Sequence, residues 1–112
     1  MRFTSALGEF CMLYMQFAKH TAESCPMHEE KIKKLYVAVY NQMEPLMKKY
    51  GIKMVGAWAS MADHLSVMVW DAPSTEAMMK MSMEPVIMAW AGYQTIETRP
   101  VMTLEETMKL LK

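Results

Sequence analysis

The stretch that decides the fold is IKMVGAWASMADHLSVMVWDA, residues 52–72. Its outer parts, 52–60 and 64–72, are rich in valine, tryptophan and other apolar residues, and the segment between them is short and polar at one end. Two apolar runs joined by a short turn predict a β-hairpin. Side chains alternate along a strand, so the second strand is predicted to carry His64, Ser66, Met68 and Trp70 on one face and Leu65, Val67 and Val69 on the other.

A further strand is predicted upstream of the hairpin. The run CMLYMQFAKH, residues 11–20, is short, contains aromatic residues and is bounded by polar ones. Residues 1–10 are interpreted as an N-terminal leader that precedes a single α+β barrel domain, residues 11–112.

A long helix is predicted between this strand and the hairpin. Apolar residues recur at helical spacing over residues 32–50. Ser24 or Cys25 is expected to cap the start of the helix, and Gly51 suits its end. Pro45 lies inside the pattern and is expected to kink or split the helix.

The sequence after the hairpin predicts a second helical region, a strand and a last short helix. Residues 73–90 form the helical region, which Pro85 is expected to break. Residues 92–100 alternate and are predicted to form the last strand. Thr103 and Glu106 have the spacing of a capping box, which predicts a C-terminal helix.

This order, β-α-β-β-α-β followed by a helix, predicts an α+β fold. It is the order of the ferredoxin-like plait, in which two helices cover one face of an antiparallel four-stranded sheet. The uncovered face is predicted to carry Tyr14, Gln16, His20, Ser66, Met68 and Trp70. Because a large exposed apolar patch marks an interface or a ligand site, two such sheets are expected to pack face to face and close a barrel across a dimer.

Four segments support a resemblance to a known superfamily: CMLYMQF, GAWAS…HLSVMVWDA, DAPSTEAM and MAWAGYQTIETRP. With the element order, they make residues 11–100 resemble the dimeric α/β-barrel superfamily. The resemblance is strongest to its small single-repeat members, such as the antibiotic-monooxygenase-like and stress-responsive barrel proteins, and to related uncharacterised families. It implies a homodimer with a pocket between the sheet and its helices or inside the barrel. Members of the superfamily include cofactor-free monooxygenases, haem-degrading enzymes, isomerases and proteins with no established activity.

Composition argues against several classes of partner. The chain has 112 residues, enough for one domain, and a formal net charge of zero, whereas nucleic-acid binding needs a basic excess or a basic stripe. No apolar run reaches the roughly 20 residues of a membrane span, and no signal peptide is expected. The two cysteines do not make a disulfide framework, which favours a cytoplasmic protein with free thiols.

Two histidines are the predicted catalytic residues. His20 ends the first strand and His64 begins the third, and these strands are central antiparallel neighbours in a plait. We therefore expect the two imidazoles at one rim of the sheet, with His64 as the general acid or base. The alternative is a pair of partly exposed histidines that hydrogen-bond to the backbone or to water. The sequence contains no phosphate-binding loop, nucleophile elbow or HExxH motif.

The segment KHTAESCPMHEEK, residues 19–31, leaves a metal site open as an alternative. A soft-metal or haem site would use His20, Cys25, His28 or His64, because thiolate and imidazole are ligands of zinc and copper. Cys25 next to a helix start is also a candidate reactive thiol. The simplest alternative is a capping residue followed by a solvated histidine. No cofactor and no metal is the preferred prediction for this segment.

The predicted function is that of a small homodimeric barrel protein that binds an apolar or aromatic small molecule. Its predicted ligand-binding residues are Tyr14, Gln16, Trp58, Ser66, Met68, Trp70 and Tyr93. Aromatic walls with a few polar groups are typical of such pockets, and the 16 methionines favour adaptable apolar packing. If the protein is an enzyme, cofactor-free oxygenation or proton transfer is expected. The rival hypothesis is a non-catalytic assembly or regulatory module.

Overall fold

The computed structural model describes residues 3–4 and 10–112, with side chains described from Met12 onward. Its elements are β1 (Phe3–Thr4), β2 (Phe10–Lys19), the 3-10 helix η1 (Ala22–Ser24), α1 (Glu30–Tyr50), β3 (Lys53–Ser60), β4 (Leu65–Ala72), α2 (Thr75–Ser82), α3 (Pro85–Ala91), β5 (Thr95–Val101) and α4 (Leu104–Leu111). The predicted α+β class is confirmed, with β1 as an additional short strand paired to the start of β2. The rest of the predicted leader, residues 1–2 and 5–9, lies outside the described residues.

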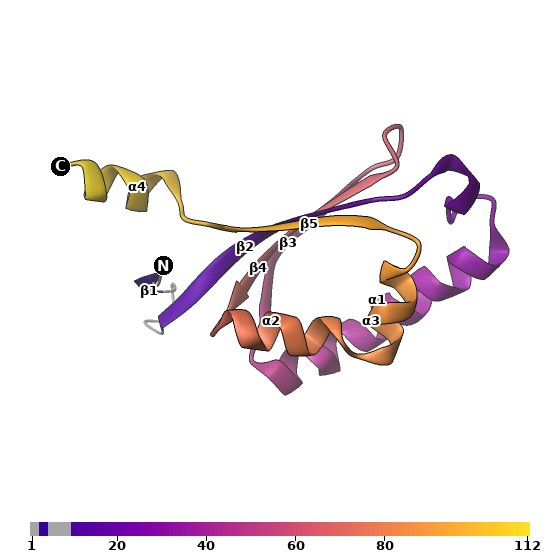
Figure 1. Ribbon diagram of the computed structural model, residues 1–112, viewed down its shortest axis with the longest axis horizontal. Coiled ribbons are helices and arrows are strands. Elements are labelled where there is room, and N and C mark those ends of the chain that lie inside the picture. The colour runs from indigo at the N-terminus through magenta and orange to yellow at the C-terminus, as the bar shows by residue number, and fades with distance from the viewer. Residues whose placement is uncertain (1–2, 5–9) are drawn as a thin grey trace.

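The main sheet has four antiparallel strands in the spatial order β5-β2-β4-β3. As predicted, β2 and β4 are central antiparallel neighbours, and the arrangement is compatible with a ferredoxin-like fold. Figure 1 shows α1, α2 and α3 on one side of the sheet, while among the described elements no helix covers the other side. Helix α4 extends away from the body at the end of β5.

Helix α1 differs from its prediction at both Pro45 and its start. It runs unbroken through Pro45, so the expected split is wrong. Proline has no N–H to donate to the Asn41 carbonyl, and both Asn41 and Pro45 are exposed residues, so the missing helical hydrogen bond falls on the outer side of α1. The start lies at Glu30, because Glu29 has an extended backbone that separates α1 from the single turn after Cys25. Gly51 ends the helix as predicted, with a left-handed φ of 67°.

The face assignment predicted for the sheet is wrong. Tyr14 and Trp70, expected on the uncovered face, are 4% and 2% exposed and pack in a core with Met78 and Met81 of α2. The Tyr14 hydroxyl also hydrogen-bonds the Thr75 hydroxyl at the start of α2. Alternation grouped the residues of each face together, but it carries no information about the side on which the helices cross.

The helix-free face consists of the other set of alternating side chains. The middle of β2 and β4 is apolar on this face, whereas β5 places Glu97 and Arg99 there, opposite Phe17 and Met15. The face carries Leu13, Met15, Phe17, Trp58, Leu65, Val67, Val69 and Val101. Cross-strand partners stack along it: Met15 lies opposite Val69, and Phe17 lies opposite Val67. Trp58 is 62% exposed, and its indole lies over Gly56, where any Cβ would collide with the ring.

Helix α4 presents a second apolar surface. It is capped by the Thr103 hydroxyl, which accepts a hydrogen bond of 3.0 Å from the Glu106 N–H. Leu104, Met108 and Leu111 recur at helical spacing, and all three are exposed. Over residues 3–4 and 10–112, no helix has the length and apolarity needed to cross a membrane.

Candidate functional site

A cavity of about 700 Å³ lies between the helix layer and the covered face of the sheet. Methionines supply much of its wall, from α1, α2 and the sheet: Met43, Met47, Met54, Met68, Met78 and Met81. Trp70, Trp90 and Tyr36 add aromatic surface. Methionine side chains are flexible and polarisable, so such a wall adapts to the shape of an apolar guest.

Gln16 is the best-positioned polar group of this cavity. Its amide nitrogen donates to the Thr98 hydroxyl at 2.9 Å, and its amide oxygen accepts from the Trp70 indole N–H at 3.2 Å. The two bonds connect three strands, because Gln16 lies on β2, Trp70 on β4 and Thr98 on β5. The amide is therefore held in one orientation at the floor of the cavity, with Ser66 nearby as a further polar lining residue.

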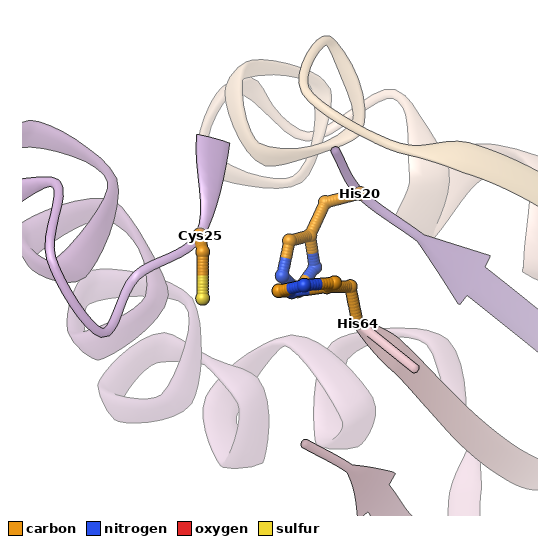
Figure 2. A group of neighbouring side chains, drawn as sticks. All are labelled: His20, Cys25 and His64. Atoms are coloured by element: carbon orange, nitrogen blue, oxygen red, sulfur yellow. The ribbon is translucent and has the colours of Figure 1, made fainter. Parts of the chain in front are cut away.

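A second group of chemically active side chains lies at the rim of the sheet. The His20 N–H donates to the His64 carbonyl at 3.0 Å, which ties the end of β2 to the residue before β4. Their imidazole centroids are 5.1 Å apart, and the rings meet edge to face at 72°. Cys25 is buried beside them, and one donor atom from each of His20, Cys25 and His64 lies within 4.8 Å of the others (Figure 2). We call these three residues the rim cluster.

A hydrogen-bonded chain connects the rim cluster to the cavity. The Tyr36 hydroxyl lies 3.1 Å from His20 Nδ1 and accepts from the Gln94 amide at 2.7 Å. Tyr36 also lines the cavity and packs edge to face on Trp90 at a centroid distance of 6.3 Å. Tyr36 is thus shared between the two regions.

Burial shifts the pKa of both His20 and Tyr36. Desolvation, and then the neighbouring His64, lower the pKa of His20 below its ordinary value. Desolvation raises the pKa of Tyr36, and the hydrogen bond from Gln94 partly opposes that change. Near neutral pH both side chains are therefore uncharged, which suits a partly buried site.

The structure distributes the predicted ligand-binding residues over four places. Cavity-lining positions are held by Gln16, Ser66, Met68 and Trp70. Tyr14 lies in the core with its hydroxyl at Thr75, and Trp58 lies on the opposite face of the sheet. Tyr93 lines a separate depression of about 450 Å³ together with His20.

Of the predicted catalytic and metal-ligand residues, three lie together and one lies apart. His20 and His64 are adjacent, as strand order predicted, and Cys25 joins them. His28 is exposed and is not a member of the rim cluster. Among the described residues, neither His20 nor His64 is part of the cavity wall.

Sequence reasoning missed Tyr36 and Gln94 as functional candidates. Tyr36 lies within residues 32–50, where the helical spacing of apolar residues predicts the long helix. Its position four residues after the buried Ile32 indicates the inner side of α1. Its hydrogen bond to His20 depends on tertiary packing, which periodicity does not encode. Gln94 lies between α3 and β5, where no spacing rule identifies it.

Comparison with protein families matches residues 12–112 to a domain of unknown function, DUF3303. The chain belongs to the DUF3303 family. The comparison with curated proteins gives no match. The DUF3303 domain of this chain spans nearly all of β2 and every later element, so it includes both the cavity and the rim cluster.

Proposed function

We propose that this DUF3303 protein binds an apolar or aromatic small molecule in the cavity between its sheet and its helices. The observation that carries the proposal is the cavity itself, about 700 Å³ with a wall of methionine and aromatic side chains. Its volume lies within the roughly 300–1,000 Å³ typical of ligand pockets, which are mostly apolar with a few fixed polar groups. Gln16 and Ser66 supply such groups, so the preferred ligand carries a hydrogen-bonding substituent on an apolar body.

The proposal includes a homodimer formed through the helix-free face. That face presents a continuous apolar surface from β2 to β4, in which Met15, Phe17 and Val69 are only half-buried. Helix α4 adds exposed leucines at the end of β5, and an isolated helix of this length is not stable in water without packing. A second copy is the occupant that covers both surfaces at once, since a two-fold interface joins the same patch on each subunit.

The ligand proposal is tested with a neutral apolar fluorophore, N-phenyl-1-naphthylamine. Met68→Trp places extra bulk in the cavity, and Met79→Trp makes the same change on the exposed side of α2, where Met79 is 61% exposed. We expect the wild type and Met79→Trp to bind one fluorophore per chain. We expect Met68→Trp to bind at least about tenfold more weakly, an increase of roughly 1.4 kcal/mol in binding free energy.

Two results would contradict the ligand proposal. One is the absence of saturable binding to the wild type. The other is an equal loss of affinity in Met68→Trp and Met79→Trp, which would place the fluorophore outside the cavity.

The chain from Gln94 through Tyr36 to His20 favours proton transfer as a second candidate function. Tyr36 borders the cavity, and its hydroxyl lies 3.1 Å from His20 Nδ1. In the His20 tautomer whose Nδ1 accepts from this hydroxyl, a proton has a route from Tyr36 to the rim cluster. Cofactor-free oxygenation would draw on the same route, because it needs a base and a dry cavity. The test is hydrogen–deuterium exchange of a weakly acidic cavity ligand: Tyr36→Phe should abolish catalysed exchange and leave ligand binding intact.

A further inference from the structure

The rim cluster contains the donor types that bind borderline transition metals. Two imidazoles and one thiol converge from three separate segments: the end of β2, the loop after η1 and the residue before β4. One donor atom from each lies within 4.8 Å of the others. Sulfur and imidazole nitrogen are the preferred ligands of Zn²⁺, and three protein ligands are the usual number where a fourth position stays open.

Two nitrogens of the cluster are buried without a hydrogen-bond partner among the described groups. They are His20 Nε2 and His64 Nδ1. A buried polar atom left without a hydrogen bond destabilises the folded protein, so proteins rarely keep two of them side by side without a use. Here both belong to imidazole rings that meet at 5.1 Å beside a buried thiol. A cation that accepts the lone pairs of these nitrogens removes that cost.

The remaining nitrogen of His20 already has the partner that a metal ligand needs. His20 Nδ1 lies 3.1 Å from the Tyr36 hydroxyl, which Gln94 holds from its other side at 2.7 Å. Metal-bound histidines commonly donate their second ring N–H to such an outer partner, which fixes the tautomer and the ring orientation. With Nδ1 as the donor to Tyr36, Nε2 is the nitrogen with the free lone pair.

The backbone positions of the three residues are fixed. The His20 N–H and the His64 carbonyl are hydrogen-bonded, and Cys25 uses its own N–H and its carbonyl in three backbone hydrogen bonds. His64 has a positive φ of 53°, a left-handed conformation that is uncommon outside glycine and that concentrates at functional sites. This conformation directs the imidazole of His64 from the turn before β4 toward His20.

We propose that His20, Cys25 and His64 form a Zn²⁺-binding site with two imidazole ligands, one thiolate ligand and an open fourth position. Tetrahedral zinc with these ligands requires donor separations of about 3.3–3.6 Å, from bond lengths near 2.0–2.1 Å to nitrogen and 2.3 Å to sulfur. The donor atoms lie within 4.8 Å of one another, so zinc binding requires side-chain rotations that shorten the longest separation by about 1.2–1.5 Å. The site goes beyond ligand binding in the cavity, and failure of either proposal leaves the other standing.

A reactive thiol without metal is the competing use of the same residues. A thiol activated by one neighbouring base needs only one imidazole, as in a Cys–His pair. It accounts for Cys25 and one histidine, and it leaves the second buried nitrogen unexplained. The metal site uses all three donors, which is why the geometry favours it.

The test measures Zn²⁺ binding to tag-free, reduced protein by competition with a chromophoric chelator at neutral pH. Cys25→Ser and His64→Asn each remove one ligand, and asparagine tolerates the left-handed backbone at position 64. Matched controls are His28→Ala and Cys11→Ser, which remove the chain's other histidine and its other cysteine. Circular dichroism confirms that each variant is folded.

We expect one Zn²⁺ per chain in the wild type and in both control variants. Tyr36→Phe, which loses the outer partner of His20, should weaken binding about 10–100-fold, and each ligand variant should weaken it further. Substitution with Co²⁺ should give a thiolate-to-metal charge-transfer band that is absent in Cys25→Ser. If Cys25→Ser does not fold, His64→Asn and Tyr36→Phe decide the question.

Three results would overturn the site. They are the absence of stoichiometric Zn²⁺ binding in the wild type, undiminished binding in Cys25→Ser or His64→Asn, and a loss of binding in a control variant. Rapid alkylation of Cys25 in a protein that binds no zinc would overturn it in favour of the reactive thiol.

Discussion

The two faces of the sheet use the same kind of side chain for different purposes. Trp70 and Trp58 belong to the two strands of one hairpin, yet Trp70 is 2% exposed beneath the helices and Trp58 is 62% exposed on the helix-free face. The covered face holds the core and the methionine-lined cavity, whereas no described helix packs on the apolar side chains of the helix-free face. The comparison teaches that the path of the helices, and not the residue type, decides what a strand residue does.

The largest expected effect separates the two tryptophans. Trp70→Ala should lower the free energy of unfolding by about 3–5 kcal/mol, because it removes a large side chain from the core. Trp58→Ala should lower it by less than about 1 kcal/mol in dilute, monomeric protein, since the indole is mostly in water there. Urea denaturation of both variants measures the difference, and equal losses would mean that the two faces are not distinguished by burial.

The next effect concerns the association of two helix-free faces. Val67→Lys places a charge in the middle of that face and should raise the dimer dissociation constant roughly 100-fold or more, because a buried unpaired charge costs several kcal/mol. The matched control is Val37→Lys on α1, where Val37 is 52% exposed on the helix layer. Analytical ultracentrifugation should show a dimer for the wild type and the control and a monomer for Val67→Lys. A wild-type monomer at every accessible concentration would contradict the dimer.

The smallest effect tests how the helix layer is held together. The Tyr50 hydroxyl donates to Glu84 Oε2 at 2.7 Å, and Lys49 Nζ lies 3.2 Å from the same oxygen, so the end of α1 is tied to the start of α3. The Tyr50 hydrogen bond, and then Lys49, lower the pKa of Glu84 below its ordinary value of 4.5. As the pH falls, Glu84 therefore becomes protonated in the unfolded chain at a higher pH than in the folded protein. The contribution of Glu84 to the free energy of unfolding is complete above pH 4.5. It is lost as the pH falls through the lower pKa of Glu84 in the folded protein.

Tyr50→Phe should bring the pKa of Glu84 closer to its ordinary value and make the loss of stability on acidification shallower. Chemical denaturation at a series of pH values from neutral to acidic measures this slope for both proteins. The effect should be smaller than either of the preceding two, because Lys49 is exposed and Glu84 keeps part of its side chain in water. An unchanged slope would show that this hydrogen bond does not act on Glu84.

Much of the fold could be predicted because its signals are local. Hairpin composition, helical spacing before Gly51 and the break at Pro85 each depend on a few neighbouring residues, and the structure confirms each of them. The proximity of His20 and His64 was also predictable, since it follows from strand order alone.

The rest depended on packing between distant segments. Alternation sorted Tyr14 and Trp70 into one group but could not say that the helices would cover them. The position of Cys25 beside the two histidines depends on the turn between η1 and α1, and the Tyr36–His20 bond depends on the docking of α1. The periodicity of the sequence predicts neither of these contacts.

The central claim is that the covered face, and not the helix-free face, receives an apolar ligand. Methionine-methyl NMR tests it directly, because the chain's 16 methionines report from both faces and from the helix surfaces. Titration with N-phenyl-1-naphthylamine should shift the methyl signals of the cavity wall, represented by Met43, Met68 and Met81, and leave those of Met15 and Met79 in place. Shifts concentrated at Met15, with the cavity methionines unchanged, would contradict the account.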